Sequence, residues 1–410
     1  MHAKIRADAL EATVHRTAES YGSEYISHRT PSHCHGKRRA YQSIPFLARA
    51  CQRVIVCTQL KRGDLSSAMP VRPVEKTRRC AGVLFGVALG DAIGAAAEFL
   101  PFDEVVQQFG PGGPERPGPQ VTDDTQMTLA VAEALLECPR PITPTGLEQS
   151  LRKFFVQWNE SPDNDRAPGT SCVRSCLSLA EGYEWLDATA INSKGCGANM
   201  RVSPVAFLNF DRDGITARQR GPIAQFQAAL THGHPTALAA ADLTATAVAD
   251  LLEGGEPVDL LDRLRDYALA EAEVYHHRWL DRLWERPGIA SPASFIREGW
   301  RQCLDALERV ESGLASERLP ADLCLVAGEG WVAEEALACA LLCFLTHAND
   351  GVAAIRRAAL TSGDSDSIAA IAGALAGAHL GVEAWPAEWI NSIEYADSIT
   401  RIAEAWERPS

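Results

Sequence analysis

The chain has 410 residues, of which 46% are hydrophobic and 22% are charged, a composition typical of a globular protein with a large core. This length fits two domains of ordinary size, or one large domain with an appendage. The formal net charge of −14 argues against a general nucleic-acid binder, because nucleic acids select basic surfaces. No apolar run reaches the roughly 18 residues of a membrane-spanning helix. We therefore expect neither a nucleic acid nor a membrane as a partner.

The first 68 residues differ from the rest of the chain. They carry 11 Lys and Arg against 5 Asp and Glu, whereas the remaining residues carry 28 against 48. Because this segment lacks a periodic apolar face, we predict a basic, disordered extension at residues 1–68 and a folded domain at residues 69–410. Two interpretations stay open. Either natural translation starts at Met69, or the extension is an arm that contacts a partner.

Cysteine usage indicates the redox compartment. The twelve cysteines are irregularly spaced and include no CxxC pair, which indicates reduced thiols and a cytoplasmic protein. Cys339 and Cys343 lie four residues apart in an apolar run, and we interpret them as core residues. His33, Cys34 and His35 are too close together to surround one tetrahedral metal ion.

Helical periodicity dominates the chain, and the alternating pattern of strands is nearly absent, so the sequence predicts an all-α fold. The first strongly apolar helix is predicted within residues 73–99. One face of this helix carries a glycine at every fourth position: Gly82, Gly86, Gly90 and Gly94. Since this face lacks side chains, we expect another backbone to approach it closely.

The same helix holds two acidic residues in an apolar context, Asp91 and Glu98. Burying an unpaired carboxylate is costly, so each requires a compensating group. A metal ion, a helix terminus and a basic side chain would each serve for Asp91. After this helix, residues 101–120 contain five Pro and four Gly, and we predict a long loop there.

Two segments place paired carboxylates and a hydroxyl group at the start of an apolar helix. Their polar residues are Thr122, Asp123 and Asp124 in the first segment, and Asp364, Asp366 and Ser367 in the second. Each could be an acidic helix cap, with Ser367 or Asp366 as the N-cap of the helix at residues 368–380. Hard oxygen ligands at this spacing also suit Mg²⁺ or Mn²⁺. Two such segments in one chain favour a binuclear metal site.

Three further loops are candidates for ligand binding. Residues 163–170 form a Pro/Gly loop that includes Gly169, and residues 193–201 form a loop in which Gly195 and Gly197 permit close approach to a phosphate. A lone GxG is weak evidence for a phosphate site. His232 precedes an Ala-rich helix at residues 236–252, where it is either a helix-end histidine or a residue that contacts a ligand.

Six motifs in this order resemble the ADP-ribosylglycohydrolase family, whose best-known bacterial member reactivates dinitrogenase reductase. The motifs are GVLFGVALGDAIGAAAEF, VTDDTQMTL, RAPGTSC, SKGCGANMRVSP, THGHP and TSGDSDSIAAIAGALAG, and they extend over roughly residues 76–390. The resemblance implies a compact, orthogonal, multi-helix all-α domain. It also implies two Mg²⁺ or Mn²⁺ ions in an ADP-ribose site.

The resemblance assigns roles to individual residues. It implies that the metal ligands are Thr122, Asp123, Asp124, Asp364, Asp366 and Ser367. It implies that the substrate is bound by Gly169, Ser193, Gly195, Gly197 and His232. The expected catalytic residues are Glu98, Asp123 and Asp364, with Glu98 lying over the metal ions. Ser367 stands where the family usually has Thr, and Cys196 stands where many relatives have Asn. Asp91 is expected to be a structural group or a group that supports the metal ligands.

The implied reaction is removal of ADP-ribose from a protein side chain, most simply arginine, by attack of water at C1 of the distal ribose. The sequence contains no evident nucleophile arrangement of the Ser/His/Asp or Cys type, which favours direct attack by water. The expected partners are an ADP-ribosylated protein and an ADP-ribosyltransferase toxin, and we expect a monomer. An alternative hypothesis is an immunity or binding module that occludes such a toxin through the extension at residues 1–68.

Overall fold

The computed structural model describes residues 77–208, 213–216 and 219–407. Within these residues the secondary structure is helical, and pairing of extended segments is limited to two isolated bridges, Ala190 with His232 and Gly195 with Val332. The predicted all-α fold is confirmed. Among the described helices, none is both long enough and apolar enough to cross a membrane. The expected extension at residues 1–68 and the segment His33–His35 lie outside the described residues.

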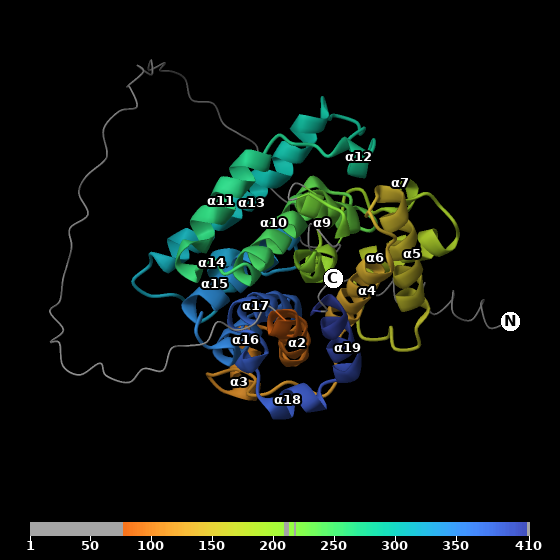
Figure 1. Ribbon diagram of the computed structural model, residues 1–410. Coiled ribbons are helices and arrows are strands. Elements are labelled where there is room, and N and C mark those ends of the chain that lie inside the picture. The colour runs from red at the N-terminus through yellow and green to blue at the C-terminus, as the bar shows by residue number, and fades with distance from the viewer. Residues whose placement is uncertain (1–76, 209–212, 217–218, 408–410) are drawn as a thin grey trace, which may run out of the picture. The chain divides into compact units, whose positions relative to one another are not determined.

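The longer helices define the architecture (Figure 1). In chain order they are α2 (Thr77–Gly94), α3 (Phe102–Phe109), α4 (Asp123–Glu137), α5 (Pro144–Glu160), α6 (Thr170–Ala180), α9 (Arg220–Ala229), α10 (Pro235–Leu252), α11 (Leu260–Glu271), α13 (Pro292–Leu314), α15 (Ala333–Thr346), α16 (Gly351–Ala359), α17 (Ser365–Leu380) and α19 (Ala396–Glu407). Short helical turns connect them: α7 (Trp185–Ala188), η1 (Cys196–Ala198), η2 (Ser203–Phe207), η4 (Pro257–Asp259), α12 (His277–Leu280), α14 (Cys324–Ala327), η5 (Val382–Ala384) and α18 (Ala387–Ser392).

Helices α2 and α17 pack backbone against backbone, as the glycine repeat predicts. A Cβ atom on Gly86 would overlap the carbonyl group of Gly373, and one on Gly90 would overlap the carbonyl group of Ala369. Further along, Gly82 faces Gly377 in the same way. The paired numbers run in opposite directions, so the two helices are antiparallel. Only glycine allows backbones to come this close.

The α2–α17 pair lies at the centre of the lower group of helices in Figure 1, where α16 and α19 flank α2. Helix α15 packs on α17, and α4 reaches both α2 and α17. The buried carbonyl group of Gly82 accepts a hydrogen bond from the indole N–H of Trp385, at 2.8 Å. Cys339 and Cys343 of α15 are fully buried, which confirms their interpretation as core residues.

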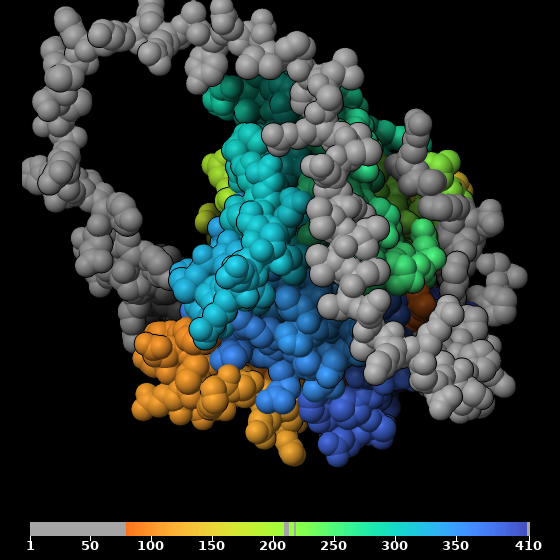
Figure 2. Space-filling view, turned by 90° about the vertical axis from the view of Figure 1, so that its left-hand side faces the viewer, coloured from red at the N-terminus to blue at the C-terminus, as the bar shows by residue number. Residues whose placement is uncertain are grey.

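The loop predicted at residues 101–120 was assigned too broadly, because it contains helix α3. The buried Val105 of this helix packs with Ala97 and Leu360 in a small hydrophobic cluster that is separate from the main core. In Figure 2 the orange surface of this region lies beside the blue surface of the C-terminal half. The many Pro and Gly residues around α3 conceal its short apolar face from a sequence argument.

The start of α17 also differs from the prediction. The helix begins at Ser365, and Asp364 occupies the N-cap position without a side-chain capping hydrogen bond. Asp366 and Ser367 therefore lie in the first turn, and neither is the N-cap. The Asp364 carboxylate makes no capping hydrogen bond to the helix, so its oxygen atoms are not used to satisfy the first turn of α17.

We expect Gly86→Ala to destabilise the domain strongly, because the new methyl group would force the α2 and α17 backbones apart. The expected loss in the free energy of unfolding is about 3 kcal/mol or more, at the upper end for overpacking of a core. Chemical denaturation measures it. The matched control is Gly118→Ala, whose Cβ atom would lie 3.8 Å from its nearest neighbour, the carbonyl oxygen of Ala92. Equal stability of both variants would contradict the tight backbone contact.

Candidate functional site

The site is assembled where the C-terminal end of α2 meets the N-terminal ends of α4 and α17. Asp91 of α2 is fully buried and connects these ends. Its carboxylate accepts hydrogen bonds from the backbone N–H groups of Thr122, at 3.0 Å, and Thr125, at 3.1 Å, and from the Thr125 hydroxyl group, at 2.5 Å. The N-terminal end of α4 thus compensates the buried carboxylate of Asp91. Its role is structural, as expected, because it holds the first turn of α4 against α2.

The first acidic segment forms the start of α4. Thr122 is the N-cap, and its hydroxyl oxygen accepts a hydrogen bond from the Asp124 N–H at 3.3 Å. Asp123 Oδ2 accepts from the backbone N–H of Gly169 at 3.3 Å. The Oδ1 atom of Asp124 is buried and has no hydrogen-bond partner in the described structure. A buried carboxylate oxygen without a partner is costly, so this position suits a cation.

The second acidic segment is held by the loop before α17. The backbone N–H of Asp364 donates to the carbonyl oxygen of Glu329 at 2.8 Å. A Cβ atom on Gly363 would overlap this same carbonyl group, so the close approach requires glycine there. Asp366 Oδ1 accepts from the Ser367 N–H at 2.9 Å. The Thr122 hydroxyl lies 3.4 Å from Asp366 Oδ2, so the two segments are in contact.

Glu98 completes the group of carboxylates. It lies on the turn after α2 and is half-buried, whereas the aspartates are buried. Glu98, Asp364 and Asp366 each offer an oxygen atom within 4.8 Å of the others, a spacing that one metal ion could bridge. We refer to Glu98, Asp123, Asp124, Asp364 and Asp366 as the acidic cluster.

The electrostatics of the acidic cluster are unfavourable without a cation. Burial and then the nearby Asp366 raise the pKa of Glu98 to about 9 and that of Asp123 to about 7. Burial likewise raises the pKa of Asp124 and Asp364 well above the usual range. Within the described residues no Lys or Arg forms an ion pair with the cluster. The donor set of carboxylate and hydroxyl oxygens therefore fits hard divalent cations.

The glycine-containing loop at residues 193–201 lies next to the acidic cluster. The loop is held by the backbone on either side of Gly195. The N–H of Cys196 donates to the Trp331 carbonyl oxygen at 3.1 Å, and the N–H of Ala333 donates to that of Lys194 at 2.9 Å. The hydroxyl groups of Ser193 and Ser171 are 2.8 Å apart. These contacts hold the loop in place.

Cys196 differs from the Asn that is common at its position, and the structure shows where its side chain lies. The thiol is buried, and burial followed by Asp364 raises its pKa well above the usual range, whereas a contact with the Ser367 hydroxyl lowers it. Cys196 is therefore a neutral thiol packed beneath the second acidic segment. The Ser367 hydroxyl also lies 3.7 Å from the sulfur atom of Met200.

His232 faces this loop from the other side. A Cβ atom on Gly195 would lie 3.5 Å from His232 Nε2, and one on Gly197 would lie 3.4 Å from the same atom. The imidazole ring therefore packs directly against the two glycines, and a Cβ atom on Gly197 would also meet the Cys172 sulfur atom at 2.8 Å. By contrast, Gly169 is exposed, and a Cβ atom there would meet no neighbour within 4 Å. The structure thus brings Ser193, Gly195, Gly197 and His232 together, whereas Gly169 contacts Asp123 of the acidic cluster.

Sequence reasoning missed several residues that shape the site. Arg166 binds Glu394 and the carbonyl oxygen of Val121, which fixes the backbone just before the first acidic segment. Glu394 lies 228 positions further along the chain, so no local pattern reveals it. Phe99 directly follows Glu98, has a positive φ of 63° and stacks on Trp331 with ring centroids 5.5 Å apart. The exposure of these two aromatic rings was not visible in the sequence.

Comparison with known proteins gives a consistent result. The ADP-ribosylglycohydrolase family profile matches residues 72–409. The ADP-ribosylarginine hydrolase Tri1 of Pseudomonas putida is 28% identical over 344 residues, covering 83% of this chain and 80% of that protein. The ADP-ribosyl-[dinitrogen reductase] glycohydrolase of Rhodospirillum rubrum is 26% identical over 323 residues, covering 77% and 90%.

A solved structure and a vertebrate relative agree with this result. The structure is titled ADP-ribosylglycohydrolase-related protein complex, and it superposes with a TM-score of 0.59 at 25% identity, covering 82% of this chain and 98% of that one. ADP-ribosylhydrolase ARH3 of Danio rerio is 28% identical over 365 residues, covering 82% of this chain and 92% of that protein. On the match over residues 72–409, this chain belongs to the ADP-ribosylglycohydrolase family.

Proposed function

We propose that this protein is a metal-dependent hydrolase that removes ADP-ribose from a modified arginine side chain of a protein. The observation that carries the proposal is the convergence of both acidic segments and Glu98 without any basic partner among the described residues. Membership of the family supports ADP-ribose as the group removed. The relative named an ADP-ribosylarginine hydrolase supports arginine as the acceptor.

The proposed metal ligands are the oxygen atoms of both acidic segments. They are Thr122, Asp123, Asp124, Asp364, Asp366 and Ser367. The partnerless Oδ1 atom of Asp124 supports this assignment, because a divalent cation would satisfy it. Two bound Mg²⁺ or Mn²⁺ ions would orient the ribose hydroxyl groups and lower the pKa of a water molecule.

The reaction breaks the bond between C1 of the distal ribose and the guanidine nitrogen, and a water oxygen bonds to the same carbon. The water gives up a proton, and the leaving nitrogen receives one, so the step balances. Glu98 suits this proton transfer, because it is the half-buried member of the acidic cluster, whereas the aspartates are buried. The buried carboxylates of Asp123 and Asp364 stabilise the positive charge that develops on the sugar ring.

The rest of the substrate would lie along the glycine-containing loop. We assign Ser193, Gly195 and Gly197 to the diphosphate, because glycine permits close approach and the Ser193 hydroxyl is half-buried at the loop. We assign His232 to the ribose. Gly169 would act through its backbone N–H group. This group donates a hydrogen bond to Asp123 Oδ2 at 3.3 Å and so orients that carboxylate.

We further propose that residues 69–410 act as one catalytic domain and that residues 1–68 are an accessory extension. The match to the family profile begins at residue 72, which supports this division. In this proposal the protein acts as a monomer in the cytoplasm on an ADP-ribosylated protein, including a target modified by an ADP-ribosyltransferase toxin. The rival proposal, an immunity module that occludes the toxin, assigns binding to residues 1–68.

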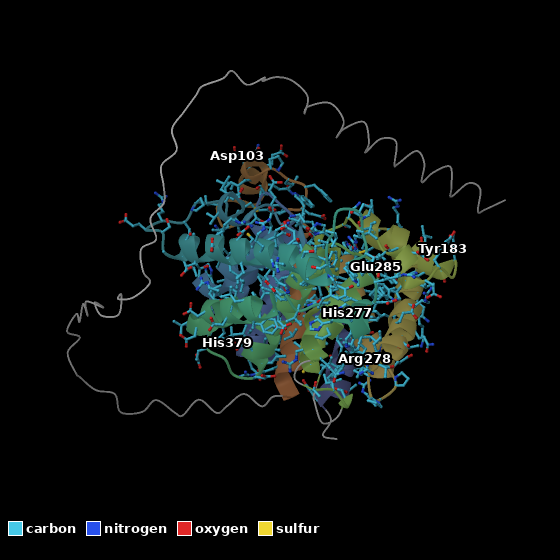
Figure 3. All side chains as sticks on the ribbon, turned by 90° about the horizontal axis from the view of Figure 1, so that it is seen from above. Asp103, Tyr183, His277, Arg278, Glu285 and His379 are labelled. Atoms are coloured by element: carbon cyan, nitrogen blue, oxygen red, sulfur yellow. The ribbon has the colours of Figure 1, made fainter. Side chains whose placement is uncertain are left out.

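Loss of a metal ligand should abolish turnover. Asp123→Asn and Asp364→Asn each keep the side-chain shape but remove an anionic ligand, so we expect release of ADP-ribose from modified arginine to fall about 10³-fold or more. EDTA should have the same effect, and added Mg²⁺ or Mn²⁺ should reverse it. The control is Asp103→Asn, an exposed residue labelled at the edge of the domain in Figure 3. Full activity in EDTA would rule out the metal-dependent mechanism.

The acidic cluster should make stability depend on pH when no metal is present. An acid whose pKa is raised on folding binds more protons in the folded state, so the free energy of unfolding falls as pH rises through the folded pKa. With folded values of about 7 for Asp123 and about 9 for Glu98, we expect the melting temperature in EDTA to decrease from pH 5 to pH 9.

Mg²⁺ should oppose this decrease, with greater stabilisation at higher pH, because ionised carboxylates bind the cation. Thermal scans of the wild type and the Asp123→Asn/Asp366→Asn double variant, with and without Mg²⁺, measure both effects. The double variant should show a flatter pH profile in EDTA. Identical pH profiles for the two proteins would contradict the proposed coupling.

Deletion of residues 1–68 should leave the melting temperature and ADP-ribose release nearly unchanged, because none of the family motifs lies in this segment. The comparison uses the full-length protein and a variant that starts at Met69. If the extension is the toxin-occluding element, deletion should abolish toxin binding and spare hydrolysis. A variant that melts many degrees lower would show that the proposed domain boundary is wrong.

A further inference from the structure

Arg201 is the last residue of the glycine-containing loop and is fully buried. In the described part of the chain no carboxylate forms an ion pair with it. Its guanidinium group instead donates to Gln227 Oε1 at 2.9 Å, to the Gln227 carbonyl oxygen at 3.0 Å and to Thr231 Oγ1 at 2.8 Å. The group also stacks on Phe155, at 4.4 Å from the ring centroid. Asp123 interacts with this charge without forming an ion pair. A buried charge without a direct ion pair is costly, which indicates a specific role.

The hydrogen bond from Arg201 to Thr231 determines which atom is the donor in the hydrogen bond between Thr231 and His232. A guanidinium group only donates hydrogen bonds, so Thr231 Oγ1 is the acceptor in this pair. Thr231 Oγ1 also lies 2.8 Å from His232 Nδ1. If Nδ1 carried a proton, two donors would point at Oγ1, and the threonine proton would have no acceptor among the described residues. The threonine hydroxyl therefore donates to Nδ1.

This direction fixes the tautomer of His232. Because Nδ1 accepts a hydrogen bond, the neutral ring carries its proton on Nε2. Burial and then Arg201 lower the pKa of His232 to about 3, so the ring is neutral near pH 7. Nε2 lies beside Gly195 and Gly197, where a Cβ atom would come within 3.5 Å and 3.4 Å of it, and no described residue accepts a hydrogen bond from it. His232 as a whole is only 2% exposed. A donor without a partner beside two residues that lack side chains points to a ligand oxygen atom.

We propose that Arg201 and Thr231 are positioning residues that hold His232 in the Nε2–H tautomer, so that it donates a hydrogen bond to an oxygen atom of bound ADP-ribose. This inference rests on the proposed function for the identity of the ligand. Arg201 acts only through Thr231 and His232. We call the hydrogen bonds from Arg201 to Thr231 and from Thr231 to His232 the relay. The relay gives the site a fixed neutral hydrogen-bond donor, whereas the other tautomer of His232 would present a lone pair to the ligand oxygen and repel it.

The test uses Thr231→Val, which keeps the side-chain shape but removes the hydroxyl group. Two-dimensional NMR of histidine labelled with ¹⁵N distinguishes the tautomers, because the protonated ring nitrogen and the unprotonated one have different shifts. A His232→Gln variant assigns the signal. We expect wild type to show only Nε2–H, and Thr231→Val to show the Nδ1–H form as well. We expect its affinity for free ADP-ribose, measured by calorimetry, to fall about tenfold, which is typical for loss of one hydrogen bond.

Two control variants separate positioning from general damage. Thr231→Ser keeps the hydroxyl group and should restore both the tautomer and the affinity. Ser175→Ala removes a nearby buried hydroxyl that donates to the Thr231 carbonyl oxygen at 3.3 Å but does not join the relay. This variant should keep the Nε2–H tautomer. In a His232→Ala background, Thr231→Val should cause no further loss of affinity, because the relay then has no endpoint.

A pure Nε2–H signal in Thr231→Val would overturn the proposal. The proposal would also be overturned if Thr231→Val lowered the affinity for ADP-ribose equally in the wild type and in the His232→Ala variant. Failure of the proposed function gives a different result. In that case the wild type binds no ADP-ribose and releases none from modified arginine, while the tautomer measurement still reports on the relay.

Discussion

The contact between α2 and α17 is the constraint on which the rest of the structure depends. Glycine on both helices removes the side chains that normally keep helix axes about 8–10 Å apart, so the two backbones touch directly. The antiparallel direction then brings the end of α2 beside the start of α17. Asp91 and Glu98 at one end and Asp364 and Asp366 at the other are neighbours because of this contact, not because of any attraction between them.

Repulsion within the acidic cluster is opposed by the scaffold around it. Asp91 fastens α4 to α2 through hydrogen bonds with Thr122 and Thr125. Arg166 and Glu394 fasten the segment before α4. The carbonyl group of Glu329 fastens Asp364. Except for the bond from the Thr125 hydroxyl group and the Arg166–Glu394 ion pair, these bonds involve a backbone group, which cannot move away as a flexible side chain can. The scaffold can therefore hold like charges close together, which is the requirement for strong binding of a divalent cation.

The sequence revealed those features that depend on local patterns. Helical periodicity gave the all-α fold, the glycine repeat predicted the backbone contact, and two hydroxyl-and-acid segments predicted a shared site. The local arguments failed where a tertiary contact decides. Helix α3 was interpreted as a loop, because its short apolar face is recognised only from its packing against Leu360, which is remote in sequence. The N-cap of α17 is Asp364 and not the predicted Asp366 or Ser367, because Glu329, which is remote in sequence, fixes the backbone at Asp364.

The direct backbone contact also limits how this domain can evolve. A side chain at Gly86 requires a simultaneous shift of the backbone at Gly373, so neither position can change through single tolerated steps. A randomised library over the glycine face of α2 would consequently return few folded proteins.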